Sequence, residues 1–498
     1  MLALVLTSWL IAHVALVPLH TGVASSVSAS RSTSYAQTTE IPRGQIIGKL
    51  VCAGDPDQSY ALYLPSNYSS ERKWPILFAF DPGARGRVPV ERFREAAEKY
   101  GWIVVGSNNS RNGTLQPSVD AWKAIIKDTH ERLAIDDERV YLAGHSGGAR
   151  LAIYFAVHCQ DCTAGVIASG AGFPVGITPS PTQRFVIFST TGTEDFNFSE
   201  VKGLDEALAK AGIAHHTEVF NGRHEWPPSA VAIEALEWME LLAMKTDKRQ
   251  RDASMIESIW QRKMQQARAL EESKHIYDAY QIYFALNDSF KGLRDVAEVE
   301  KKLSQLHDTA EVRTAIRDEQ QQIGKQREIE NRLRGWMSAR EQDTTTQDGT
   351  QETNKQADGS QGLNAETRLQ GMLMDLHKQA GLAEDTGERR VARRVLDGVF
   401  IGLFEQGMNQ LQTQKRYEEA VRTLKLATEV KPERAGAFFY LAWAYAATGD
   451  RKKSLRALQT AVEKGFSDLS AITGNKAFDG IRDDAQYRQI IQAMQNKR

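Results

Sequence analysis

The residue with the clearest chemical potential in this sequence is Ser146, which stands in the segment Gly144–Gly148 (GHSGG). The apolar stretch Val140–Ala143 precedes this segment, and a helix-forming stretch, Gly148–Val157, follows it. A serine between a buried strand and a helix, with glycine two positions away on either side, can occupy a strained turn that exposes its hydroxyl. The pattern predicts a nucleophilic serine, and the Gly147 amide at the start of the helix is positioned to stabilise an oxyanion.

A serine hydroxyl is a weak nucleophile, so it needs a general base, and the base needs a carboxylate that orients it. Both partners are expected on loops that follow later strands of the same sheet. Asp195 follows the expected strand Phe185–Ser189, and His224 follows the last expected strand, Thr217–Phe220. We therefore predict a Ser146–Asp195–His224 triad, with Glu194 as the alternative acid.

Three further histidines fit the role of the base less well. His215 and His216 open the last expected strand, so they should lie at the opposite end of that strand from His224. His145 lies inside the serine turn and is expected to shape the pocket rather than to abstract a proton.

The second oxyanion donor is expected after the strand Ile76–Phe80, where the sequence continues with Asp81 and Pro82. Proline has no backbone N–H, so the candidate donors are the amides of Gly83 and Ala84. Asp81 is interpreted as a residue that ties this loop together rather than as a catalytic acid.

Short apolar runs alternate with amphipathic stretches over residues 45–245, which predicts a doubly wound, mostly parallel α/β sheet. The first two expected strands, Ile47–Cys52 and Tyr60–Leu64, have no helix between them and should form an antiparallel edge. The remaining expected strands are Ile103–Gly106 and Gly165–Ala168, and the expected helices are Val90–Tyr100, Val119–Leu133, Gly148–Val157, Glu200–Ala211 and Ser229–Leu242.

The N-terminal segment, residues 1–29, has the pattern of a signal peptide: an apolar run, Leu2–Leu19, is followed by small residues around Val27–Ala29. No Lys or Arg precedes the apolar run, so a retained membrane anchor is the alternative. Residues 30–44 are expected to be a flexible tether. We predict an exported protein, periplasmic or secreted, that meets a membrane only if the N-terminal segment is retained.

The chain has three cysteines, and Cys159 and Cys162 are close enough in sequence to close a local disulfide in an oxidising compartment. No metal site is predicted, because a structural zinc site needs four ligands and this region offers too few. The net charge is −1, from 62 basic and 63 acidic residues, so no field of one sign gathers nucleic acid, and no nucleic-acid partner is expected.

The chain after Met244 has a different character, with no strand signals. Residues 250–340 are expected to be helical, with a degenerate repeat (Ala267, Leu270, Ala279, Tyr283) followed by a charged helix. Residues 341–367 are polar and are expected to be a disordered linker. Residues 368–498 contain a 34-residue repeat, in which one set of positions (Gly407, Leu411, Ala420, Leu424, Ala427, Pro432) returns as a second (Leu441, Tyr445, Ser454, Leu458, Ala461, Phe466).

Residues 45–245 and the C-terminal repeat each resemble a known family. Residues 45–245 are similar to compact α/β-hydrolases of the polyhydroxybutyrate-depolymerase, feruloyl-esterase and phospholipase/carboxylesterase group, on the segments Tyr63–Tyr68, Phe80–Gly83, Gly144–Arg150, Gly192–Asp195 and Gly222–Trp226. The resemblance implies hydrolysis of a carboxylic ester through an acyl-enzyme, with no metal and no cofactor. The C-terminal repeat resembles the tetratricopeptide repeat, which implies a protein or peptide partner.

The sequence thus predicts an exported serine hydrolase that cleaves a small or polymeric ester and carries a helical repeat region for protein interaction. Two alternatives remain open. The chain could be a non-catalytic envelope scaffold on a degenerate hydrolase fold, or a serine peptidase, since no residue separates ester from amide cleavage.

Overall fold

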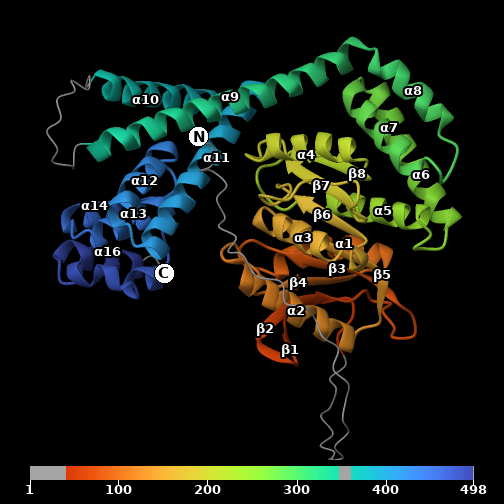
Figure 1. Ribbon diagram of the computed structural model, residues 1–498, viewed down its shortest axis with the longest axis horizontal. Coiled ribbons are helices and arrows are strands. Elements are labelled where there is room, and N and C mark those ends of the chain that lie inside the picture. The colour runs from red at the N-terminus through yellow and green to blue at the C-terminus, as the bar shows by residue number, and fades with distance from the viewer. Residues whose placement is uncertain (1–40, 347–359, 497–498) are drawn as a thin grey trace, which may run out of the picture. The chain divides into compact units, whose positions relative to one another are not determined.

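The structure is a computed structural model that describes residues 41–346 and 360–496. It contains two compact units (Figure 1). Of the described residues, the first unit comprises 41–195 together with Glu200–Arg313, and the second comprises Phe196–Ser199 together with 314–346 and 360–496.

An eight-stranded sheet forms the centre of the first unit, in the order β1-β2-β4-β3-β5-β6-β7-β8. The pairs β1–β2 and β2–β4 are antiparallel, and all other pairs are parallel, so the carboxyl ends of the parallel strands meet at one edge. The strands are β1 (Ile46–Cys52), β2 (Asp55–Tyr63), β3 (Trp74–Phe80), β4 (Ile103–Ser107), β5 (Ile135–His145), β6 (Gly165–Ser169), β7 (Val186–Gly192) and β8 (His215–Phe220).

Helices cover both faces of this sheet, because its inner strands are apolar on both sides; every residue of β3 is buried. The helices α1 (Arg87–Tyr100) and α5 (Ser229–Lys245) pack on one face. The helices α2 (Leu115–Arg132), α3 (Gly147–His158) and α4 (Phe198–Ala211) contribute to the core on the other. The predicted doubly wound, mostly parallel sheet with an antiparallel edge is therefore confirmed.

Three helices that follow the sheet region belong to the first unit: α6 (Ala253–Glu272), α7 (Ile276–Phe290) and α8 (Ala297–His307). Leu241 and Met244, near the end of α5, are buried in the same apolar cluster as residues of these helices. The region expected at 250–340 is thus divided between the two units. The physical reason is that α5 buries side chains on two sides, against the sheet and against α6–α8.

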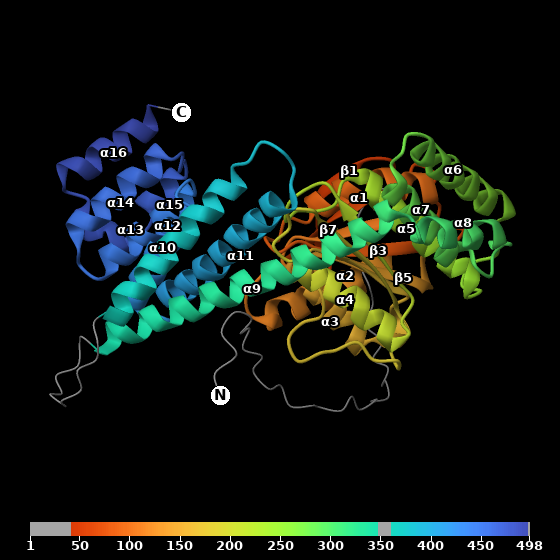
Figure 2. The ribbon, with the colours of Figure 1, turned by 90° about the horizontal axis from the view of Figure 1, so that it is seen from above.

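The second unit is built from helices, as predicted for the C-terminal region. Figure 2 shows α9, α10 and α11 running alongside one another, and residues of all three share one apolar cluster. The helices are α9 (Ala310–Thr346), α10 (Ser360–Ala380), α11 (Gly387–Asn409), α12 (Tyr417–Val430), α13 (Ala435–Ala447), α14 (Arg451–Glu463), α15 (Leu469–Thr473) and α16 (Ala485–Gln495).

The repeat positions identified in the sequence lie where consecutive helices of the second unit pack. Ala420, Leu424, Leu458 and Ala461 are fully buried. A Cβ atom at Gly407 would lie 2.6 Å from Cγ of Leu424, so the absence of a side chain there lets α11 and α12 approach closely.

The four residues Phe196–Ser199 also belong to the second unit, although they directly follow Asp195 in the chain. The side-chain amide of Gln326 donates a hydrogen bond of 2.9 Å to the Phe196 carbonyl. The buried Arg394 guanidinium lies 3.6 Å from the centre of the Phe198 ring, which is a cation–π contact.

The predicted linker at residues 341–367 needs a correction at both ends. Helix α9 continues to Thr346 and helix α10 begins at Ser360, while residues 347–359 lie outside the described residues. Adding a residue to a formed helix costs far less than nucleating one, so a polar flank can continue a helix without a core of its own.

The signal-peptide prediction for residues 1–29 and most of the predicted tether at 30–44 fall outside the described residues. Within residues 41–346 and 360–496, no helix combines the length and apolarity needed to cross a bilayer.

Candidate active site

Ser146 occupies the turn between β5 and α3, with backbone angles φ 55° and ψ −122°. A positive φ is costly for a residue with a side chain, so the surrounding backbone must hold it there. The Ser146 amide donates to the Ser169 carbonyl at 2.8 Å. A Cβ atom at Gly144 would lie 2.0 Å from the Gly148 carbonyl oxygen, and one at Gly148 would lie 1.9 Å from that of Phe80. Both glycines are required by close backbone approach, as the sequence pattern indicated.

Asp195 and His224 follow β7 and β8, and their side chains meet. Nδ1 of His224 lies 2.8 Å from Oδ1 of Asp195. A carboxylate only accepts hydrogen bonds, so Nδ1 carries the proton and Nε2 is left as the basic nitrogen. The Asp195 side chain is only 1 % exposed, whereas that of His224 is 18 % exposed and therefore accessible to a substrate.

The Asp195–His224 pair lies beside the serine turn. Gly170 follows Ser169, the residue whose carbonyl holds the Ser146 amide. A Cβ atom at Gly170 would lie 2.9 Å from Oδ2 of Asp195 and 3.1 Å from Nδ1 of His224. Among the residues that the structure describes, the Ser146 hydroxyl makes no hydrogen bond, and such contacts in enzymes free of substrate are often longer than in the complex.

Glu194, the alternative acid, and His145, the histidine inside the serine turn, have other contacts. Glu194 accepts a hydrogen bond of 3.3 Å from Nε of Arg223. His145 is buried, with its ring 4.5 Å from that of His224 and 5.7 Å from that of Trp226. Burial, followed by the neighbouring His224, lowers the pKa of His145 to about 3, so its imidazole is neutral at physiological pH and supports the His224 ring by packing.

The carboxylate of Asp81 connects the loop after β3 to the loop after β8. Its Oδ1 accepts from the Gly83 amide and from Nε of Arg85, each at 2.8 Å. Its Oδ2 accepts from Nε1 of Trp226 at 2.9 Å, and Trp226 stands two residues after His224. The side chain of Asp81 is fully buried. Asp81 thus ties the loop, as expected from the sequence, and it also anchors the chain next to the histidine.

The predicted oxyanion donors differ in their availability. The Gly147 amide stands at the N-terminus of α3, beside Ser146. The Gly83 amide donates to the Asp81 carboxylate, and the Ala84 amide donates to the Asp81 carbonyl at 3.1 Å. Both amides after β3 are therefore already used within their own loop.

One residue near the serine was missed by the sequence reasoning. Asn112, in the loop after β4, packs on Gly147: a Cβ atom at Gly147 would lie 1.9 Å from Oδ1 of Asn112. The signal available in the sequence was the Asn112-Gly113 pair in the polar segment that follows the expected strand Ile103–Gly106, which indicates only a turn.

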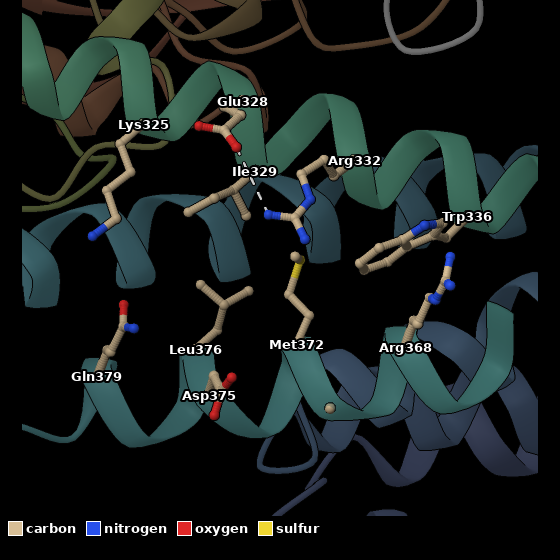
Figure 3. A pocket seen from close by; sticks show the side chains of 11 residues that line it. Lys325, Glu328, Ile329, Arg332, Trp336, Arg368, Met372, Asp375, Leu376 and Gln379 are labelled. Atoms are coloured by element: carbon tan, nitrogen blue, oxygen red, sulfur yellow. Dashed lines mark ion pairs between the residues drawn. The ribbon is translucent and has the colours of Figure 1, made fainter. Parts of the chain in front are cut away.

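A second candidate site lies within the second unit, in a groove of about 560 Å³ between α9 and α10. Figure 3 shows Ile329, Met372 and Leu376 in the groove, with charged side chains around them. Arg332 pairs with Glu328 at 3.7 Å. The residues that line this groove include no serine, cysteine or histidine, so it is suited to binding rather than to covalent chemistry.

No family model matches this chain, and no curated protein matches it. Among solved structures, it is similar to S-formylglutathione hydrolase from Staphylococcus aureus, with 15 % identity over 40 % of this chain and 98 % of that chain and a TM-score of 0.33. It is similar to the feruloyl esterase module from Clostridium thermocellum, with 16 % identity over 39 % and 85 % and a TM-score of 0.32. It is also similar to the Pyrobaculum calidifontis esterase, with 13 % identity over 41 % and 87 % and a TM-score of 0.34.

The fold itself is recognised from the arrangement of the chain. A mostly parallel sheet with a serine on a strained strand-to-helix turn, followed along the chain by an acid and a histidine after later strands, is the α/β-hydrolase arrangement.

The hydrogen bonds to the ionised Asp81 carboxylate should stabilise the first unit against unfolding, and this contribution can be measured. Burial alone would raise the pKa of Asp81, but the hydrogen bonds from Arg85, Trp226 and Gly83 outweigh it and hold the pKa below its usual value. We expect Asp81→Asn to lower the free energy of unfolding of the first unit by about 1.5–3 kcal/mol at pH 7. Because the folded-state pKa is depressed, this stabilisation is complete above the unfolded pKa of about 4 and is lost as the pH falls through the folded value.

Urea unfolding followed by tryptophan fluorescence, at pH 7 and at several values below pH 4, measures this difference. Asp161→Asn is the matched control, because Asp161 pairs with Arg184 while both side chains are largely exposed, and such pairs contribute little. Equal stability of Asp81→Asn and the parent at pH 7 would contradict the role of the Asp81 carboxylate.

Proposed function

We propose that this protein is a serine hydrolase that cleaves a carboxylic ester through a Ser146–Asp195–His224 triad. The observation that carries the proposal is the 2.8 Å hydrogen bond between Asp195 and His224, formed beside a serine held at positive φ. Strain of this kind persists only where the surrounding structure enforces it, and it is concentrated at functional sites.

In the proposed cycle, Nε2 of His224 accepts the Ser146 proton while Oγ attacks the ester carbonyl carbon and the carbonyl electrons move onto oxygen. Collapse of this tetrahedral intermediate expels the alcohol, which takes the proton from His224, and leaves an acyl group on Ser146. Water then attacks the acyl carbon as His224 accepts its proton, and a second collapse releases the carboxylic acid and returns the proton to Ser146. Asp195 stabilises the imidazolium at each stage and keeps the ring in one tautomer.

Two alternatives predict different behaviour. A non-catalytic scaffold would have no need of a buried carboxylate aimed at a histidine, so the burial of Asp195 favours an enzyme. A serine peptidase would use the same triad, although an amine leaving group needs protonation by His224 more than an alcohol does. Because the triad does not separate the two reactions, the support for an ester substrate is the resemblance to esterases on the segments given above.

We also propose that the protein is exported, with residues 1–29 as a cleaved signal peptide. The sequence pattern supports this proposal, and so does the bond between Cys159 and Cys162, since disulfides persist in oxidising compartments.

For the second unit we propose a protein or peptide partner that binds in the groove between α9 and α10. The support for this proposal is the lining of the groove, in which apolar side chains such as Ile329 and Met372 lie among three basic residues (Lys325, Arg332, Arg368) and two acidic ones (Glu328, Asp375). Basic residues exceed acidic ones by one in this lining, so it favours an amphipathic segment that carries acidic side chains.

Substitution of the nucleophile tests the catalytic proposal. We expect Ser146→Ala to abolish hydrolysis of short p-nitrophenyl esters and covalent labelling by a fluorophosphonate, because both need the Ser146 oxygen. Ser180→Ala, at a half-buried serine in the loop between β6 and β7 whose hydroxyl lies 2.9 Å from that of Thr182, should leave both unchanged. Labelling that survives Ser146→Ala would disprove the assignment, and a parent chain that neither labels nor hydrolyses would favour the scaffold.

Export is tested by the N-terminus of the mature chain. The full sequence is expressed in a bacterial host, and the protein in the extracytoplasmic fraction is sequenced from its N-terminus. We expect it to begin after the small residues that end at Ala29; a protein that keeps Leu2–Leu19 and sediments with membranes would support the retained anchor instead.

Binding in the groove is tested by selection from a peptide display library with the full chain. We expect amphipathic acidic peptides whose affinity falls at least about tenfold with Met372→Glu, since that change places a like charge in the groove. Met374→Glu, on the same helix but outside the groove and 69 % exposed, is the matched control. Selected peptides that bind both variants equally would contradict this site.

A further inference from the structure

In the proposed mechanism, the second hydrogen-bond donor to the oxyanion has not been assigned to a residue. A tetrahedral intermediate needs two hydrogen-bond donors directed at its oxyanion, and Gly147 supplies one. The amides of Gly83 and Ala84 both donate to Asp81, so neither is free to turn toward the substrate without breaking a bond to a buried residue. We propose that the side-chain amide of Asn112 is the second oxyanion donor; this inference rests on the proposed function.

The position of Asn112 is the first support. Its side chain occupies the space that a side chain at residue 147 would fill: a Cβ atom at Gly147 would lie 1.9 Å from Oδ1, 2.9 Å from Cγ and 3.2 Å from Nδ2 of Asn112. The Asn112 amide group is therefore adjacent to the backbone of the residue whose N–H is the first donor. Glycine at position 147 is what makes this approach possible, because any larger residue would displace Asn112.

The loop that carries Asn112 is fixed to the loop after β3. The Asn112 backbone amide donates to the Pro82 carbonyl at 2.9 Å, and Gly83 and Arg111 form an isolated antiparallel bridge. At the base of the loop, the hydroxyls of Ser107 and Ser110 lie 2.8 Å apart and are buried. These contacts fix the backbone of Asn112 beside Gly147, so only the side-chain amide has to be oriented for donation.

The side chain of Asn112 is also available. Among the described residues it makes no hydrogen bond, and the residue is exposed at this edge of the sheet. Oδ1 faces Gly147 in the structure, and a half-turn about χ2 exchanges Oδ1 with Nδ2 at little cost. An oxyanion between Gly147 and Asn112 would select the orientation in which Nδ2 donates.

The test uses the full chain and two substitutions, Asn112→Ala and Asn112→Asp, with a p-nitrophenyl ester as substrate. Loss of one oxyanion donor lowers kcat by about 10²–10³-fold, while KM changes little because the donor acts on the transition state. Asn112→Asp keeps the shape of the side chain but places a carboxylate at the oxyanion, so it should lose at least as much activity as Asn112→Ala. Thr114→Ala, an exposed residue of the same loop whose side chain makes no capping hydrogen bond, is the matched control and should keep its kcat.

A second readout separates donation from a purely structural role. An alkyl boronic acid forms a tetrahedral adduct on Ser146 that imitates the intermediate, so its inhibition constant should rise by the same factor as kcat/KM falls. A structural defect would instead change the melting temperature and KM. If Asn112→Ala keeps kcat within about threefold while Ser146→Ala is inactive, the Asn112 assignment is overturned and the triad stands. If the parent chain neither hydrolyses esters nor labels at Ser146, both proposals fall together.

Discussion

The structure of the active site depends on one constraint, the close backbone approach around the serine turn. The Phe80 carbonyl at the end of β3 lies where a side chain at Gly148 would be, and the Gly148 carbonyl lies where one at Gly144 would be. With no side chains in the way, α3 starts directly against the carboxyl end of β3, and Ser146 is forced to positive φ. Every other functional group is placed relative to this point, because the loops after β3, β4, β7 and β8 end at the same edge of the sheet.

Asp81 shows how two loops at that edge are fixed to each other. It is a buried carboxylate that binds donors from its own loop and from Trp226, 145 residues away in the chain. A buried charge is expensive unless every oxygen is satisfied, so the arrangement is stable only when both loops are in place. The position of His224, two residues before Trp226, is thereby coupled to the loop after β3.

The fold and the pairing of Asp195 with His224 could be predicted because they follow from local patterns. Each strand of the described residues was predicted from an apolar run. The chain order of serine, acid and histidine predicted the pair Asp195 and His224, which the structure brings into contact. Errors occurred where context overrides pattern. Strand β2 begins at Asp55, in polar residues, because an antiparallel hairpin with β1 supplies its hydrogen bonds at a solvated edge. The assignment of α6–α8 to the first unit depends on Leu241 and Met244, whose burial on a second side of α5 no periodicity reveals.

The loop after β3 was the least predictable part of the site, because the Asp81 carboxylate and a substrate oxyanion would both accept hydrogen bonds from its backbone amides. Pro82 removes one backbone donor, and the buried Asp81 carboxylate then requires the Gly83 amide for its own stability. The sequence shows the proline but not which acceptor the remaining amides choose. Because the Gly83 and Ala84 amides both donate to Asp81, the loop is held rigidly, and we propose that its oxyanion donor is replaced by one from another loop. The space over Gly147 is open to such a donor only because that residue has no side chain, and Asn112 fills it through the pairing of two loops that are distant in sequence.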